Sequence, residues 1–318
     1  MGHKRWRRAS AILIVGPAVS ATVLAAGPAS AADGFTIDST VQVAPTGMAA
    51  EPDQSRYWVV GGTAGRLSVH AVDASGRSQG ATRSTDQVRD PEALAFHDRR
   101  LYVGDIGGQR SEVDVWRLIT PVPGTVISHA ERLRYRYPDG SHRAAAMFVT
   151  PTGRIHVVTT GANPGIYAAP DQLNGAAVLA LKRVASAPVG VTDATSLADG
   201  RVVVRTASAV STLDSASFAV SARGALPKQS NGAALTTTLS GTELLAAPAA
   251  SKGAVVSLAI PGGAPAPSDF VTPSAAPTPQ GQPAGAPALF SLTSGVGMVL
   301  ASAAAAALIA AVIVVARR

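Results

Sequence analysis

Three carboxylates that could together bind a hard cation lie in the first third of the sequence. Asp90 and Glu92 stand two residues apart, and Asp105 follows within the stretch Gly104-Asp105-Ile106-Gly107. Both stretches fall at the ends of one predicted hairpin, which brings them together. Carboxylate oxygens are the ligands that calcium prefers. Asp90, Glu92 and Asp105 are therefore the candidate metal ligands, with calcium as the candidate ion, and no catalytic residue or further cofactor is predicted.

The same residues have a structural interpretation, which we favour over the metal site. Asp side chains in loops often accept hydrogen bonds from nearby backbone amides. In this interpretation Asp90 and Asp105 hold the loop backbone, and Glu92 caps or pairs locally.

Short apolar runs separated by turn residues must position these side chains. Five strand-like cores begin at residues 57, 101, 155, 202 and 243, so their spacings are 44, 54, 47 and 41 residues. The last four cores each follow a turn and an upstream run, which indicates β-hairpins. Third strands are predicted at Arg66 to Ala71, Val113 to Leu118, Gly165 to Ala168, Ala209 to Leu213 and Ala254 to Ile260.

Repeats of roughly 40–50 residues with several strands each are typical of propeller blades. The predicted fold is therefore an all-β propeller over residues 32–260, with about five blades and a sixth, irregular blade left open. A strand from Phe35 to Val43 is expected to complete the last blade and close the ring. A β-sandwich with irregular spacing is the alternative.

Several stretches carry a resemblance to a known family. They are Glu92-Ala93-Leu94, Leu101 to Gly107, Val115 to Leu118, Tyr135 to Gly140 and Gly153 to Thr159. Over roughly residues 55–250 the chain resembles secreted actinobacterial β-propeller proteins of unassigned function. It resembles the esterase-like and phytase-like propellers more distantly, which implies a metal-dependent hydrolase or an inactive relative of one.

The chain departs from that family where the family is acidic. Gly108-Gln109 replace an Asp-Asn pair, residues 143–147 read Arg-Ala-Ala-Ala-Met in place of Asp-Ala-Glu-Ala-Leu, and residues 232–234 read Gly-Ala-Ala in place of Gly-Glu-Ala. Asp193 is a shorter substitute at one of these positions. A cation or acid–base site needs several converging oxygens, so these losses favour a protein that binds without catalysis.

The two ends of the chain are predicted to direct and hold it at a membrane. Residues 1–31 combine a basic start, a short apolar run and the small-residue site Ala29-Ser30-Ala31, which is typical of a secretory signal peptide. Residues 289–316 are apolar and long enough to span a bilayer. The arginine pair 317–318 is expected to stay in the cytoplasm, which places the exterior domain outside the cell.

Between them, residues 261–288 are rich in Pro, Ala and Gly, and predict an extended linker. Small residues such as Gly295, Gly297 and Ala301 let helices approach closely in lipid. These small residues are explained either by self-association of the membrane helix or by an ordinary bias toward alanine in the composition.

Charge and cysteine content exclude some classes of protein. Six of the 27 basic residues lie in the two end segments, which hold no acid, so the remainder has 21 basic and 20 acidic residues. This balance argues against nucleic acid as a partner, because nucleic-acid binding needs a clustered basic face. The chain has no cysteine, which excludes disulfides and thiolate metal sites.

The sequence therefore predicts a membrane-anchored surface propeller that binds a cell-envelope protein or a wall polymer without catalysis. The rival is an esterase-like or phytase-like hydrolase with its cation on Asp90, Glu92 and Asp105, and an inactive remnant of such an enzyme is a third interpretation. The aromatic residues Trp58, Trp116, Tyr102 and Tyr137 are predicted to pack between blades, with a sugar-binding groove as the alternative.

Overall fold

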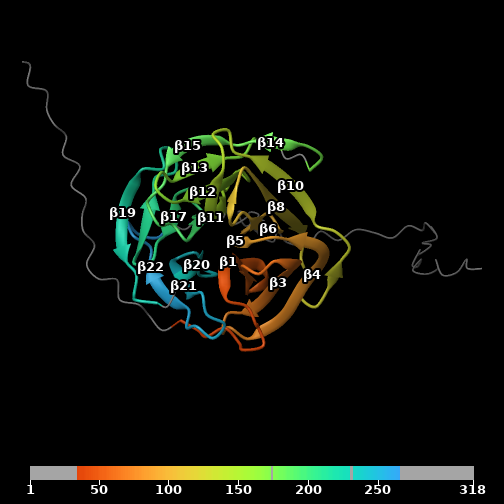
Figure 1. Cartoon of the computed structure of the whole chain (residues 1–318). Coiled ribbons are helices and arrows are strands. Elements are labelled where there is room, and N and C mark those ends of the chain that lie inside the picture. Colours follow the sequence, from red (N-terminus) through yellow and green to blue (C-terminus); the bar gives the residue numbers. More distant parts are fainter. Residues whose placement is uncertain (1–33, 173–174, 230–231, 266–318) are drawn as a thin grey trace, which may run out of the picture. The chain divides into compact units, whose positions relative to one another are not determined.

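Five sheets surround a common axis in the computed structural model, which describes residues 34–172, 175–229 and 232–265 (Figure 1). The innermost strands are β1 (Pro45–Glu51), β5 (Pro91–His97), β11 (His142–Val149), β16 (Asp193–Ser196) and β20 (Gly232–Thr237). Each of them contacts the innermost strands of the two neighbouring sheets, and β20 contacts β1 again. The fold is therefore a closed five-bladed β-propeller.

Each blade is an antiparallel sheet that extends outward from its innermost strand. Blade 1 continues with β2 (Arg56–Gly61), β3 (Gly65–Asp73) and β4 (Ser78–Val88), and a short 3₁₀ turn, η1 (Pro52–Gln54), joins β1 to β2. Blade 2 continues with β6 (Arg100–Asp105), β8 (Glu112–Ile119) and β10 (Glu131–Arg136). Blade 3 continues with β12 (Ile155–Thr160), β13 (Gly165–Ala168) and β15 (Lys182–Ser186).

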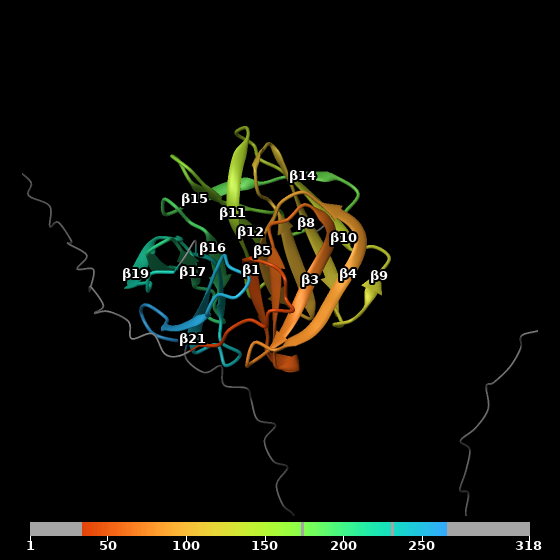
Figure 2. The same cartoon turned by 60° about the horizontal axis from the view of Figure 1, so that its bottom comes forward.

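Blade 4 continues with β17 (Val202–Arg205), β18 (Ala209–Leu213) and β19 (Val220–Ala225), and blade 5 with β21 (Glu243–Pro248) and β22 (Val256–Ala259). Three short strands cross between blades. β14 (Val178–Ala180) pairs in parallel with β10 at the outer edge (Figure 1), and β9 (Val126–Ile127) pairs in parallel with β4 (Figure 2). β7 (Gln109–Arg110) pairs with the start of β11.

The blade prediction is confirmed. The five cores found by spacing are the second strands of the five blades, and the runs upstream of the last four are innermost strands. Each predicted third strand overlaps β3, β8, β13, β18 or β22. The described residues form five blades, and a sixth is not found among them.

The first described residues connect blade 5 to blade 1 as predicted, but the strand predicted over Phe35 to Val43 is not formed. Thr36 forms a bridge with Ala254 of blade 5, and the Val255 amide donates a 2.8 Å hydrogen bond to the Phe35 carbonyl. The Phe35 ring also stacks on Tyr57 of blade 1 at 5.5 Å between ring centroids. The first described residues therefore connect the last blade to the first.

Side chains between adjacent blades form the core. Valine, leucine and alanine alternate along the inner and second strands, so one set of residues faces each neighbouring blade. The prediction that four aromatic residues pack inside the fold is confirmed, since all four are buried: Trp58, Tyr102, Trp116 and Tyr137. These four side chains therefore do not line an open groove.

The predicted signal peptide (residues 1–31) and membrane helix (residues 289–316) lie outside the described residues. Among the residues that are described, no helix has the length and apolarity to cross a membrane.

Candidate functional site

The end of the propeller at which the innermost strands begin is called the upper face here, and the end at which they finish is called the lower face. Four of the five innermost strands have a register shift at the upper face, which leaves Thr46, Glu92, Ala145 and Ala233 as extra residues. A β-bulge re-aims a side chain and often lies beside a functional site. Only Glu92 among the four carries a charge.

Asp105 ends β6 at the upper face and is 1% exposed. Its Oδ1 accepts a 2.8 Å hydrogen bond from the Asp90 amide, and its Oδ2 accepts one of 3.1 Å from the Arg89 amide. The Arg110 guanidinium donates to the same carboxylate at 3.2 Å. Asp105 thus holds the loop before β5, which is the structural role that the sequence indicated for it.

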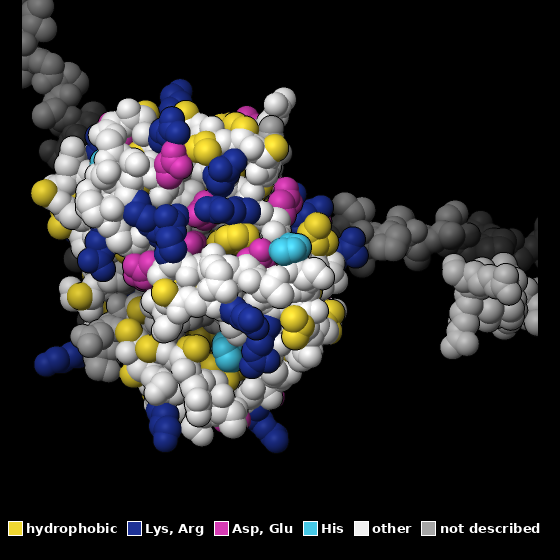
Figure 3. Space-filling model, turned by 45° about the vertical axis from the view of Figure 1, so that its right-hand side comes forward, with side chains coloured by type: hydrophobic (Ala, Val, Ile, Leu, Met, Phe, Trp, Pro, Cys, Tyr) yellow, Lys and Arg dark blue, Asp and Glu magenta, His cyan; other side chains and the backbone are white. Residues whose placement is uncertain are grey.

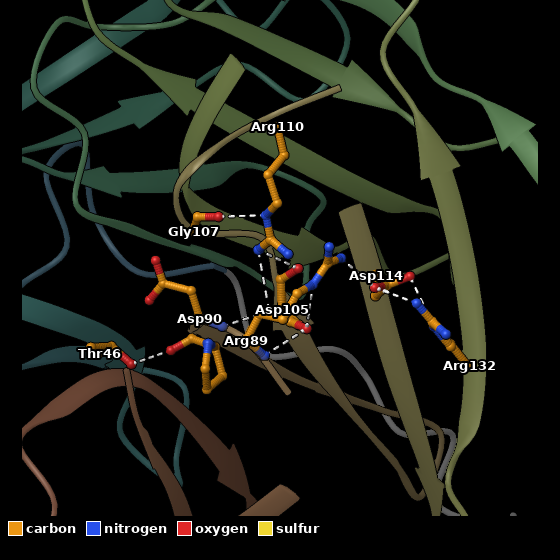
Figure 4. A network of polar contacts seen from close by, with 9 residues as sticks. Thr46, Arg89, Asp90, Asp105, Gly107, Arg110, Asp114 and Arg132 are labelled. Carbon is orange, nitrogen blue, oxygen red and sulfur yellow. Dashed lines mark hydrogen bonds and ion pairs between the residues drawn. The ribbon is translucent and has the colours of Figure 1, made fainter. Parts of the chain in front are cut away.

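Asp90 turns its carboxylate away from Asp105, toward the loop after β6 (Figure 4). A Cβ atom at Gly107 would lie 2.2 Å from the Asp90 Oδ2, so only glycine leaves room for this carboxylate. The Gly107 amide in turn donates a 3.0 Å hydrogen bond to the Asp90 carbonyl. Gly107, the second glycine of the Gly-Asp-Ile-Gly stretch, is therefore required by the close packing of the Asp90 carboxylate.

Glu92 is a half-buried carboxyl beside Asp90. Its pKa is raised to about 7, mainly by burial and also by the neighbouring Asp90 carboxylate, against the lowering effect of the Arg143 guanidinium. The side chain is therefore close to half protonated at neutral pH. Such a carboxyl is able to give or take a proton near pH 7.

The three predicted metal ligands share one region but not one point. Asp90 and Glu92 are electrostatic neighbours, whereas the Asp105 oxygens are directed at backbone amides and Arg110. Within residues 34–172, 175–229 and 232–265, no group of three or more His, Asp or Glu side chains is arranged to hold a metal ion. The calcium site at Asp90, Glu92 and Asp105 stays a prediction.

Asp193, the shorter substitute, links two blades. It is fully buried, and its oxygens accept 2.8 Å and 2.7 Å hydrogen bonds from the amides of Ala194 and Leu235. Burial raises the pKa of this carboxyl well above its usual value. Arg205 is also buried and donates hydrogen bonds to the carbonyls of Ala234 and Ala247 in blade 5. Asp193 and Arg205 thus each connect blade 4 to blade 5 through hydrogen bonds to the backbone.

Three arginines lie around two buried aspartates at the upper rim (Figure 4). Asp114 accepts hydrogen bonds from Arg89 at 2.7 Å and from Arg132 at 2.9 and 3.0 Å. Asp105 pairs with Arg110, and its Oδ2 lies 3.9 Å from the Arg89 Nε. We call Arg89, Arg110 and Arg132 with Asp105 and Asp114 the arginine cluster.

Sequence reasoning missed this cluster except for Asp105. The signal that was available is alternation along β10, where Arg132, Arg134 and Arg136 point to the same side of the sheet. Across β8 this side carries Asp114 and Glu112, and Arg136 donates to the Glu112 carboxylate at 2.6 Å. Arginine and acidic side chains are accordingly interspersed over this part of the surface (Figure 3).

An open hollow of about 320 Å³ lies beside the arginine cluster, between blades 2 and 3. It is lined by Arg89, Gln109, Arg110, Ser111, Glu112 and Ser141. One nitrogen of Arg110, Nη1, is buried and has no hydrogen-bond partner among the described residues. The cavity on the propeller axis is smaller, about 80 Å³, and is lined by the lower halves of the innermost strands.

No protein-family model and no curated protein matches the sequence. Solved structures with a similar fold include a hydrazine synthase from Kuenenia stuttgartiensis, with a TM-score of 0.38 and 19% identity over 64% of this chain and 55% of that one. This chain therefore spans about half of that protein.

Two further solved structures are covered almost completely. The gluconolactonase XC5397 from Xanthomonas campestris has a TM-score of 0.41 and 14% identity, over 73% of this chain and 98% of that one. The PQQ-bound aldose sugar dehydrogenase from Streptomyces coelicolor has a TM-score of 0.43 and 13% identity, over 75% and 99%.

Proposed function

We propose that the chain is an exported, membrane-anchored propeller that binds an anionic component of the cell envelope at the arginine cluster, without catalysing a reaction. The observation that carries this proposal is the convergence of three guanidinium groups on two buried carboxylates, beside an open hollow. The Glu112 carboxylate also lines this hollow and is paired with Arg136. The anchoring part is supported by the sequence of residues 1–31 and 289–316.

The cluster is preorganised for an anion. The buried carboxylates of Asp105 and Asp114 fix the guanidinium planes, while the side chains of Arg89 and Arg132 stay 56% and 47% exposed. An arginine held in this way keeps N–H groups available for carboxylate or phosphate oxygens, which it binds in a two-pronged geometry. Little ordering of these side chains is then needed when a ligand binds.

Binding of polyanions by the full chain in detergent tests this proposal. We expect inorganic polyphosphate or polygalacturonate to bind. The double variant Arg89→Gln/Arg132→Gln should weaken the affinity at least tenfold, because the loss of even one charge-assisted hydrogen bond costs about 1.5–3 kcal/mol. Comparison of the two polymers separates phosphate from carboxylate recognition.

Arg223→Gln is the matched control, since Arg223 is an exposed arginine on β19 of blade 4. Equal weakening by this control, or no binding of either polymer, would count against the proposal. Binding through the cluster should also weaken with added salt, since exposed charges are screened.

The rival hydrolase has one observation in its favour, the Glu92 carboxyl with a pKa of about 7 next to Asp90. Its test is thermal unfolding with and without calcium, since a ligand that binds only the folded state raises its stability. A calcium-dependent rise in Tm that Glu92→Ala abolishes would support a metal site. An unchanged Tm favours the binding module.

A further inference from the structure

A second hollow lies at the lower face, between blades 3 and 4, on the opposite side of the molecule from the arginine cluster. Its volume is about 390 Å³, within the range of about 300–1,000 Å³ that is typical of small-molecule sites. The turns that join β11 to β12 and β18 to β19 form its walls, with Thr152, His156, Asp171, Ser215 and Phe218 among its lining residues. We call it the lower hollow.

One wall of the lower hollow is aromatic. The His156 imidazole stacks on the Phe148 ring with 4.7 Å between centroids and 3° between planes. The Phe218 ring lies 5.4 Å from the imidazole at 59°. Burial lowers the pKa of His156 to about 4, so its ring is neutral at physiological pH and the wall is uncharged.

Phe218 is held in place by an unusual backbone conformation. Its φ of 55° lies in the left-handed region, which costs a bulky residue on the order of 1–3 kcal/mol. The turn before it is pinned by Asp214, whose Oδ1 accepts hydrogen bonds from the amides of Ala216 and Ser217. The Phe218 amide donates a 3.0 Å hydrogen bond to the Asp214 carbonyl. The aromatic ring is therefore placed beside the hollow at the expense of backbone strain.

The rim of the lower hollow is polar. Thr152 and Ser215 are exposed, and the Thr152 hydroxyl lies 2.9 Å from that of Thr150. The Arg154 Nε donates a 2.6 Å hydrogen bond to Asp171, whose side chain is 74% exposed. An exposed ion pair of this kind adds little to stability, and both of its groups have capacity for further hydrogen bonds.

We propose that the lower hollow binds one pyranose unit of a glycan. A sugar ring has an apolar C–H face and a rim of hydroxyl groups, and the hollow offers the complementary pair of surfaces. The C–H face would lie against Phe218, while the hydroxyls exchange hydrogen bonds with Thr152, Ser215 and Asp171. This site is separate from the arginine cluster and does not depend on the proposed anion binding.

Saturation-transfer NMR on the full chain in detergent tests the inference, with cellotetraose and chitotetraose as probes. We expect at least one of them to bind with a Kd on the order of 1 mM, which is usual for a single shallow subsite. The variant Phe218→Asn should lower the affinity at least tenfold. Asn tolerates the left-handed conformation, so the turn is kept. Because the Phe218 ring also packs against Phe148 and His156, the Tm of this variant is measured to check that it stays folded.

Thr152→Ala is a second variant, because it removes a rim hydroxyl at an exposed position and is expected to weaken binding about threefold. Arg83→Gln is the control, since Arg83 is an exposed arginine on β4 of blade 1, outside both proposed sites, and this variant should bind the sugar as the native chain does. Absence of signal from both sugars at about 10 mM, or unchanged affinity in Phe218→Asn and Thr152→Ala, overturns the inference.

Discussion

At the scale of single residues, Asp105 determines how the loops of blade 2 are held at the upper face. Both of its oxygens accept backbone amides, from Arg89 and Asp90, and Arg110 adds a charged donor. Its neighbour Asp90 makes no comparable set of contacts and turns toward Gly107. Asp105 and Asp90 therefore differ in their structural roles, because only the Asp105 side chain holds the backbone of the loop before β5.

Asp105→Ala should destabilise the chain by about 3 kcal/mol, because each buried amide left without an acceptor costs about 1–3 kcal/mol. Asp90→Ala is the matched control and should change the free energy of unfolding by less than about 1 kcal/mol. Urea unfolding of both variants measures the difference. Equal effects would show that Asp105 does not hold the loop.

Glu92 should make stability depend on pH. Its pKa is raised to about 7 in the folded chain, above the ordinary 4.5, so the folded state binds the proton more tightly than the unfolded state. The carboxyl therefore stabilises the fold at low pH, and this contribution is lost as pH rises from about 4.5 to about 7. With allowance for solvent screening, we expect a loss on the order of 1 kcal/mol.

Glu92→Gln should flatten this part of the profile, since glutamine does not titrate. Urea unfolding at about pH 5 and about pH 8 compares the two chains. We expect the native chain to lose stability relative to Glu92→Gln between the lower and the higher pH. If the difference in the free energy of unfolding between the two chains is the same at both pH values, the raised pKa is contradicted.

The candidate site was only partly predictable. Glycine spacing and acidic residues drew attention to Asp90, Glu92 and Asp105, and these do lie in one region. Asp114 and Arg132 were not found, because they come from β8 and β10, and their pairing depends on a strand register that a single sequence does not reveal. The lower hollow combines two blades and so has no local signal at all.

At the scale of elements, the hairpin between β5 and β6 has a two-residue turn of uncommon composition. Asp98 and Arg99 have φ values of 47° and 56°, and His97 pairs with Arg100 across the turn. Two positive φ values are the geometry of a type I′ turn, which favours glycine at its second position. Arg99 is exposed and fills that position without glycine.

Arg99→Gly should therefore stabilise the chain by about 0.5–1 kcal/mol, because glycine adopts the left-handed conformation without steric cost. Gly241→Ala is the reverse test in the turn between β20 and β21, where φ is 70° and no atom lies within 4 Å of an added Cβ. It should destabilise by about 1 kcal/mol. Differential scanning calorimetry reads out both, and a fall in Tm for Arg99→Gly would refute the strain argument.

The second and third strands of each blade were predictable because they are short, apolar and bounded by turn residues. The fourth strands were not. β4 is largely polar in sequence, β19 has only one buried position, and β15 is largely exposed, so their apolar pattern is weak. β9 and β14 span only two and three residues and exist through pairing with another blade.

At the scale of the whole molecule, the proposed membrane anchor makes a direct prediction. Alkaline carbonate washing of envelopes should leave the full chain in the membrane fraction, because about 20 apolar residues are enough to span a bilayer. A chain that ends at Ala288 should appear in the medium or in the wash. Release of the full chain by carbonate would exclude a membrane-spanning helix.

The bridge between Thr36 and Ala254 also sets an order of events during synthesis. A ribosome makes Phe35 and Thr36 at the start of the propeller and Ala254 and Val255 near its end. Phe35 and Thr36 therefore cannot form these contacts until Ala254 and Val255 have been synthesised. Pairings between residues so far apart in the sequence form slowly. The ring of a nascent chain would therefore stay open until blade 5 has been synthesised.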